Sequence, residues 1–312
     1  MAKTDLTRDL LSRFDRLEGQ RQNWETHWQE VADYMQPRKA DVTKTRSKGD
    51  KRTELVFDSS PMQAVELLAA SLHGMLTNPA TTWFSLRFKG GEFEDNDEAK
   101  AWLEDSTEVM YNAINKSNFQ QEIFELYHDL ITFGTAAMFI EEDDEDTLKY
   151  STRHINEMYI SENDKGRIDT IFRKFRLTAR AAIQKFGANV SDNIVTINRK
   201  DPYEEIEILH AIYPRSDFDP KKQDKVNMPF ESVYLEAGTG DELSVSGFKE
   251  FPFVVPRYLK ASHEIYGRSP AMTALPDVKM LNEMSKVIIK SAQKQVDPPL
   301  LVPDDGFMLP VR

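Results

Sequence analysis

Residues 251–299 read FPFVVPRYLKASHEIYGRSPAMTALPDVKMLNEMSKVIIKSAQKQVDPP. An apolar extended run gives way, through the turn at Gly267, to one long helix. Ser269 can cap this helix and Pro270 suits its first turn. We expect Pro276 to kink it, because proline removes one backbone hydrogen bond. From there the helix should run for about 20 residues, or roughly 30 Å, before the double proline ends it. Little of the chain follows, so we expect this helix to pack against something other than its own chain.

Four lysines gather on one side of the predicted helix. At about 100° per residue, an arc of about 80° holds Lys279, Lys286, Lys290 and Lys294. Glu283 lies on the same arc and can pair with the first two lysines. The last two lack an acidic residue four positions earlier, so they are the better candidates for facing a polyanion. The alternative is that all four are surface lysines, since the helix dipole also favours lysines near a C-terminus.

The opposite side of the predicted helix is broad and apolar. Its residues are Met280, Leu281, Met284, Val287, Ile288 and Ala292, and it is widened by Val278 and Ile289. The pattern therefore predicts a helix that is buried on most sides.

The rest of the chain predicts an α+β body that precedes one protruding helix. We expect helices at 4–36, 60–76, 96–116, 118–134 and 178–187. Strands are expected at 83–88, 137–140, 148–150, 158–161, 168–177, 205–213, 231–236, 243–248 and 252–259. Asn118 and Thr178 are expected to cap their helices, and Gly134 and Gly187 to end theirs.

The first predicted helix carries a seam of large apolar residues at steps of three and four, which Arg21 interrupts. The seam consists of Leu10, Phe14, Leu17, Trp24, Trp28, Val31 and Met35. It suits either a free coiled coil or a helix that packs on a globular body, and we favour the packed helix.

Two charged segments each allow a functional and a plain interpretation. Residues 38–54 are rich in lysine and arginine, which suits either a nucleic-acid patch or a solvated, mobile loop. The acidic run 141–146 suits either a divalent-cation site or a solvated hairpin tip, and it lacks the spaced ligands of a calcium loop. We favour the plain interpretation for both.

The composition excludes several classes of protein. The chain has 312 residues, a net charge of −12 and no cysteine, so it does not suit a protein that coats DNA and has no thiolate metal site. No apolar run reaches the roughly 18 residues that span a bilayer, and the N-terminus lacks a signal core. We expect an intracellular, soluble protein. No pair among the six histidines has helical zinc spacing, and no phosphate-binding loop or nucleophile elbow is present.

The order of these elements resembles the portal (head-to-tail connector) proteins of short-tailed, podovirus-type bacteriophages. The terminal segment quoted above carries part of the resemblance, and further motifs share it in order and at plausible spacing. They are SLHGMLTNP at 71–79 followed by Trp83-Phe84, FGTAA at 133–137, and FRKF at 172–175 leading to TAR at 178–180.

The resemblance implies a fold with three parts. Residues 1–265 would form a wing-like α+β body, residues 266–297 a stem helix, and residues 298–312 the start of a truncated clip-like region. Members of the family are considerably longer, so a second stem helix, a tunnel loop and a crown would follow Arg312.

The resemblance also implies a structural role without catalysis, cofactor or metal. Twelve copies would usually form a ring at the capsid vertex of the virion, assembled in the host cytoplasm, around a passage for double-stranded DNA. Lys279, Lys286, Lys290 and Lys294 would line that channel. The terminase large subunit, scaffold or capsid protein and tail adaptors would be partners, and no membrane would be. Two alternatives stay open, namely another virion component such as a tail adaptor and a metal-dependent hydrolase that uses residues 141–146.

Overall fold

The computed structural model describes residues 5–298, except 45–46, 48, 90–95, 144, 146, 223 and 225. The α-helices are α1 (Asp5–Met35), α2 (Ser60–Leu76), α3 (Asp97–Lys116), α4 (Phe119–Phe133), α5 (Ala179–Phe186), α6 (Asp192–Lys200) and α7 (Pro270–Val296). The strands are β1 (Ala137–Asp143), β2 (Thr147–Arg153), β3 (Met158–Glu162), β4 (Ile168–Thr178), β5 (Glu205–Pro214), β6 (Phe230–Glu236), β7 (Glu242–Phe248) and β8 (Phe253–Val254). Short 3-10 turns are η1 (Pro37–Lys39), η2 (Ile155–Glu157) and η3 (Gly187–Asn189).

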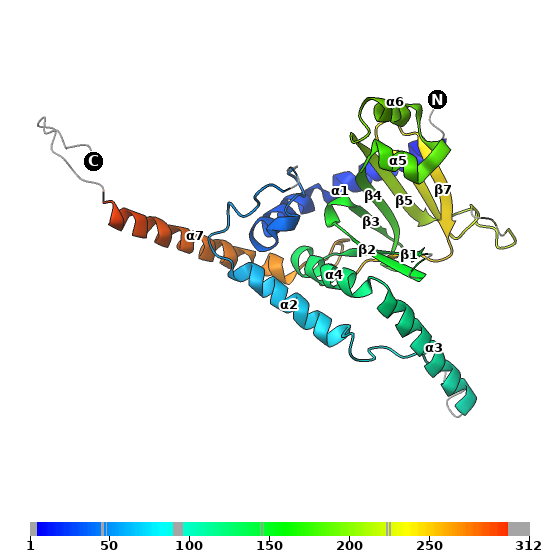
Figure 1. Cartoon of the computed structure of the whole chain (residues 1–312), viewed down its shortest axis with the longest axis horizontal. Helices are drawn as coiled ribbons and strands as arrows, with labels where there is room; N and C mark the ends of the chain where they lie inside the picture. Colours follow the sequence, from blue (N-terminus) through cyan, green and yellow to red (C-terminus); the bar gives the residue numbers. More distant parts are fainter. Residues whose placement is uncertain are drawn as a thin grey trace, which may run out of the picture.

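The strands form two antiparallel sheets, which confirms the α+β fold class with a long C-terminal helix. One sheet has five strands in the order β3-β4-β5-β6-β7, and the other has the order β2-β1-β8. Figure 1 shows the larger sheet at one end of the molecule and α7 projecting from the other end. The helix thus leaves the body that holds its root.

The five-stranded sheet is covered on both faces, and each face has its own apolar cluster. Leu10 and Phe14 of α1 pack on one face, where Phe14 meets the Tyr159 ring edge-on at 4.7 Å. On the other face, Phe186 of α5 packs with Phe175 and its neighbours. Since successive side chains of a strand point to opposite faces, alternate residues of β4 and β5 serve the two clusters.

The largest core joins the C-terminal half of α1 to α2, α4, the small sheet and the root of α7. Trp28 and Phe133 are fully buried in it, and Tyr266, Ala271 and Leu275 bring the start of α7 into the same core. Apolar burial contributes about 1.5–3 kcal/mol for each large side chain, so this core is the main source of stability that holds the helices together.

The predicted helices at 4–36, 60–76, 96–116, 118–134 and 178–187 are confirmed to within about two residues. Thr178 caps α5 by accepting a hydrogen bond from the Ala181 amide, and Gly134 ends α4 with a φ of +76°. The hairpin turn between β1 and β2 is also confirmed, although Asp144 and Asp146 lie outside the described residues.

The predicted strand at 83–88 is wrong, because this extended segment packs on α3 rather than in a sheet. The Tyr111 hydroxyl accepts hydrogen bonds from the amides of Trp83 and Phe84, and the Thr107 hydroxyl accepts one from Leu86. Side chains thus take the place of a strand ladder. Alternating apolar residues report an extended backbone, but they do not identify what satisfies its amides.

Asn118 does not cap α4, which corrects a second expectation. Its side chain lies across to β2, where it donates to the Tyr150 carbonyl at 2.8 Å and accepts from the Tyr150 amide at 2.9 Å. The residue therefore joins α4 to the edge of the small sheet.

Arg21 does not interrupt the seam of α1 but belongs to it. Its side chain is 1% exposed, and its guanidinium donates to the carbonyls of Ile155, Asn156 and Met158 at 2.7–3.0 Å. The guanidinium also lies 3.7 Å from the centroid of the Tyr159 ring. A buried arginine is stable here because the carbonyls of η2 and of the first residue of β3 satisfy its donors. The packed form of the seam is confirmed.

Two further differences come from local chemistry. Helix α6 is absent from the prediction, since its Ile194-Val195-Thr196-Ile197 run is β-branched, yet the Ser191 hydroxyl accepts from the Ile194 amide and starts a helix. The strand predicted at 252–259 shrinks to Phe253–Val254. Pro252 and Pro256 lack amide donors, and they contribute only their carbonyls, to Ile140 and Ala136.

Candidate functional site

The candidate site is α7 together with the surface that holds its root. Two glycines meet there from segments far apart in the chain. A Cβ atom on Gly134 would overlap the carbonyl oxygen of Gly267, and a Cβ on Gly267 would overlap that of Gly134. The Gly134 carbonyl accepts from the Tyr258 amide at 2.9 Å, and the Gly267 amide donates to the Thr135 hydroxyl at 2.8 Å. The end of α4 and the start of α7 therefore touch backbone to backbone.

Ser269 both starts α7 and fastens it to α4. Its hydroxyl accepts from the Met272 amide at 2.9 Å and donates to the Thr132 carbonyl at 2.9 Å. Pro270 occupies the first turn, as expected, and the helix continues through Pro276 to Val296. The kink at Pro276 stays a prediction. The first turns of α7 are thus fixed in position by a buried cap.

An aromatic ring of α1 completes the surface that holds the root of α7. The Trp28 ring lies edge-on to the Tyr266 ring at 5.0 Å, and its indole N–H donates to the Phe133 carbonyl at 3.1 Å. Burial raises the pKa of Tyr266 to about 12, so its hydroxyl stays protonated at neutral pH. One side of the root is therefore apolar and fully packed.

Asn282 is the last position at which the described body buries a side chain of α7, and beyond it the Lys286 ammonium still lies 5.6 Å from the centroid of the Phe57 ring. Its side-chain oxygen accepts from the amides of Phe57 and Asp58 at 2.7 and 3.3 Å, and its nitrogen donates to the Leu55 carbonyl at 2.9 Å. Asn282 is 4% exposed, and no described residue of α7 beyond it is buried. The distal half of α7, residues 283–296, is about 20 Å long at 1.5 Å per residue.

The expected apolar face of α7 is present but uncovered, so the helix is not buried on most sides by the described residues of its own chain. Its exposed residues are Met280 (60% exposed), Leu281, Met284 (54%), Val287, Ile288 (65%) and Ile289. Such a contiguous apolar surface is typical of a protein–protein interface.

The four lysines of α7 have different surroundings. Lys279 pairs with Glu30 of α1 rather than with Glu283, whereas Lys286 pairs with Glu283 at 2.7 Å as expected. Lys290 and Lys294 are exposed and have no ion pair with any residue that the structure describes. The geometry thus separates the two body-proximal lysines from two free ones near the helix tip.

The acidic run and the histidines do not form a metal site among the described residues, where no three side chains of the ligand types lie together. His128 is packed, with its ring edge-on to Phe124 at 4.9 Å, as expected for a core histidine. Asp129 is buried against the Lys39 ammonium at 2.6 Å, and its burial raises the pKa of its carboxyl group. No helix in the described ranges is long and apolar enough to cross a membrane.

The basic segment 38–54 is largely engaged by the body. Lys39, Lys44 and Arg52 pair with Asp129, Asp33 and Asp41 respectively. Arg46 and Lys48 lie outside the described residues. The ion pairs weaken the nucleic-acid interpretation, since these side chains already have partners in the chain.

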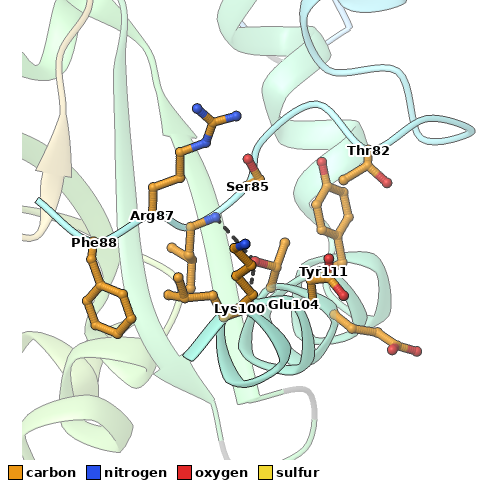
Figure 2. Close-up of a pocket in the computed structure, with 11 residues that line it drawn as sticks. Thr82, Ser85, Arg87, Phe88, Lys100, Glu104 and Tyr111 are labelled. Carbon is orange, nitrogen blue, oxygen red and sulfur yellow. Dashed lines mark hydrogen bonds between the residues drawn. The ribbon is translucent and has the colours of Figure 1, made fainter. Parts of the chain in front are cut away.

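A groove of about 690 Å³ lies between the 82–88 segment and α3. Figure 2 shows Ser85, Arg87 and Phe88 on one side of it and Lys100, Glu104 and Tyr111 on the other. Its lining mixes both charge signs with apolar carbon.

Sequence reasoning did not find the roles of Asn282 and of the glycine pair. Gly134 did stand inside the FGTAA motif, and Gly267 inside the terminal segment 251–299, and a glycine in such a motif is a signal of close backbone approach. Asn282 gave a weaker signal, as a polar residue within a predicted apolar face.

Comparison with known proteins agrees with this architecture. A family model described as bacteriophage head to tail connecting protein matches residues 7–311. A probable portal protein of Bordetella phage BPP-1 is 32% identical over 308 residues, and a portal protein of Salmonella phage epsilon15 is 33% identical over 309. Both alignments cover 97% of this chain but only 56% and 55% of the relatives, so the chain spans about half their length. The chain belongs to the family of bacteriophage head to tail connecting proteins.

Proposed function

We propose that this chain is a structural subunit of a ring-shaped portal at the phage capsid vertex, through which double-stranded DNA is packaged and ejected. One observation carries the proposal: α7 leaves the body with an uncovered apolar face and with two lysines, Lys290 and Lys294, that have no described partner. An apolar face needs a protein neighbour, and free lysines at its margin suit a polyanion.

The proposed ring gives each side of α7 a task. Neighbouring helices would cover Met284, Val287 and Ile288, and the lysine arc would then face the central passage. At 25 cal/mol per Å², each side chain of this size contributes about 1–2 kcal/mol when it is fully covered, so several together support assembly. Lys279 and Lys286 would contribute less to the passage, because Glu30 and Glu283 already neutralise them.

A weak contact with DNA suits a conduit better than a strong one. Affinity for DNA rises with the number of phosphates that a protein neutralises, and tight binding would stop movement of the duplex. The chain carries a net charge of −12, so a few lysines on an otherwise acidic subunit give low affinity per subunit. The passage would therefore guide DNA without holding it.

The proposal assigns the parts of the chain as follows. Residues 1–265 form a wing-like body, residues 266–297 the stem helix, and residues 298–312 the start of a clip-like region. Its partners are other copies of the same chain, in a ring of twelve, together with DNA, the terminase large subunit, scaffold or capsid protein and tail adaptors. The role is structural, with no catalytic residue. A tail adaptor, the alternative, would not need Lys290 and Lys294 to face a lumen.

The test is the double substitution Lys290→Glu and Lys294→Glu in the full-length protein of the phage. We expect rings of normal size by negative-stain microscopy but fewer DNA-filled heads, counted by quantitative PCR of nuclease-protected DNA. The matched control is Lys165→Glu with Lys200→Glu, which makes the same charge change at exposed positions of the body. Equal packaging by the two double variants would disprove the channel role of these lysines. If the Lys290→Glu and Lys294→Glu variant formed no rings and still packaged DNA normally, the portal role itself would be disproved.

A further inference from the structure

A row of polar side chains crosses the large sheet on the face that α5 and the β1–β2 hairpin cover together. Arg173, His210 and Tyr234 are cross-strand neighbours on β4, β5 and β6. The His210 and Tyr234 rings stack at 3.8 Å and 7°. The ring centroids of Phe139 of β1 and His210 lie 6.5 Å apart, and those of Phe186 of α5 and Tyr234 lie 5.3 Å apart. The row therefore lies at the seam between the β1–β2 hairpin and α5.

The hairpin and α5 both add cations to this seam. Because Phe139 faces the row, every second residue of β1 and its cross-strand partner face it too, which places Glu141, Lys149 and Arg153 there. From α5, the Lys185 ammonium lies 4.5 Å from the centroid of the Tyr234 ring and 3.4 Å from its hydroxyl. With Arg173 of β4, the seam holds four cations from three elements, β2, β4 and α5.

Two of the four cations have carboxylate partners and two do not. Arg173 pairs with Glu157 at 2.7 Å, and Lys149 reaches Glu141 at 3.7 Å. Arg153 and Lys185 form no ion pair with a described residue, and the Nε atom of Arg153 is buried without a hydrogen-bond partner there. Glu236, on the same sheet face, is engaged by Ser191 and Asn193 of the α6 region instead.

The seam is thus locally positive in a chain whose net charge is −12. Burial and the nearby Arg173 guanidinium lower the pKa of Arg153, and the carboxylates of Glu157 and Glu141 oppose part of that lowering. A buried guanidinium nitrogen without a hydrogen-bond partner is destabilising, so an anion that pairs with this arginine would be bound favourably.

We propose that this seam binds an acidic peptide segment of a partner protein, with Arg153 and Lys185 each taking one carboxylate. A guanidinium and an ammonium both suit carboxylate oxygens, and the exposed Lys185 side chain marks where the seam reaches the surface. Because the two unpaired cations belong to different elements, β2 and α5, one extended segment with two acidic side chains can pair with both. The Tyr234 hydroxyl is a further donor beside Lys185.

The site is remote from the tip of α7. Figure 1 shows α5 and the large sheet at the opposite end of the molecule from the end of α7. A partner bound here would leave the stem helix free. The inference therefore does not depend on the proposed DNA channel, and either can fail alone.

The test uses a fluorescein-labelled hexaglutamate peptide and the 312-residue chain, with binding followed by fluorescence anisotropy at low salt. We expect Lys185→Gln and Arg153→Gln each to weaken binding on the order of tenfold, which corresponds to about 1.4 kcal/mol. Lys200→Gln, an exposed lysine of α6 outside the seam, is the control and should bind like the parent. Circular dichroism checks the fold, and the exposed Lys185→Gln variant keeps the test valid if Arg153→Gln unfolds.

Three results would overturn the inference. The first is no binding of hexaglutamate by the parent chain, and the second is equal weakening by Lys200→Gln and Lys185→Gln. The third is stabilisation against heat by inorganic phosphate through Lys185 without any binding of hexaglutamate. That last result would assign the seam to a small anion rather than to a protein partner.

Discussion

Replacing Gly134 by alanine should loosen the root of α7, and the cost divides into two parts that other glycines isolate. Gly134 has a φ of +76°, where an L-residue costs about 1–2 kcal/mol. Its new Cβ would also lie 2.7 Å from the carbonyl carbon of Gly267, so the two segments must separate. Separation strains the hydrogen bonds that join them, at about 1 kcal/mol each for two bonds. The sum is about 3–4 kcal/mol.

Two control variants measure the parts separately. Gly49 has a φ of +90° and nothing within 4 Å of a Cβ, so Gly49→Ala should cost only the backbone strain of about 1–2 kcal/mol. Gly267→Ala meets the same contact from the other side, without a positive φ, and should cost about 2 kcal/mol. The cost of Gly134→Ala should therefore approach the sum of these two.

The assay is urea unfolding of the three variants, with hydrogen exchange at the Met272 amide as a local probe of the root. The double variant Gly134→Ala with Gly267→Ala should cost less than the two single changes added together, because the first change already opens the contact. The reasoning is refuted if Gly134→Ala costs no more than Gly49→Ala, or if the double variant is strictly additive.

The remaining predictions concern the other supports of the fold. Arg21→Met should destabilise the chain by about 3–5 kcal/mol in urea unfolding, because it leaves buried carbonyls unpaired. The control, Arg13→Met at a half-exposed site, should cost under about 1 kcal/mol. Similar costs for the two variants would contradict this prediction. Asn282→Ala should speed hydrogen exchange at the Phe57 amide with little change in global stability, and unchanged exchange would show that Asn282 does not hold that segment. Burial holds the pKa of His210 well below its usual 6.5, so the unfolded chain takes up the proton first. The free energy of unfolding should therefore fall as the pH drops below about 6.5, by up to about 1.4 kcal/mol per pH unit for this group, and His210→Gln should flatten that slope.

The sequence was sufficient to predict the elements whose signals are local. The stops at Gly134 and Gly187 and the caps at Ser269 and Thr178 depend on residues next to one another in the chain, and all four are confirmed. The seam of α1 was also readable, because a helix repeats its buried face every three or four residues.

The failures share a physical reason, which is that the partner lies far away in the chain. Arg21 looked like an interruption until carbonyls 134 to 137 positions later satisfied its donors. Asn118 looked like a cap, but its better partner was the backbone of Tyr150. Residues 83–88 looked like a strand, because the alternation does not reveal that hydroxyl groups of α3 would take up the amides.

The candidate site divides in the same way. The lysine arc and the apolar face of α7 were readable from helical periodicity, and Glu283 was correctly paired with Lys286. The pairing of Lys279 with Glu30 joins residues 249 positions apart, so only the fold could supply it. The seam of Arg153 and Lys185 needed the register of two sheets, which no single stretch of sequence contains.

The end of side-chain support at Asn282 has a consequence for how this chain can vary. Substitutions at the buried positions Ala271, Met272, Leu275 and Asn282 must keep the monomer folded, since these side chains lie in a packed root. Beyond Asn282, the monomer sets almost no requirement, because its described residues bury none of those side chains. Residues 283–296 can therefore diverge or be redesigned without loss of a foldable chain, and any constraint that relatives show there must come from what the helix meets after folding.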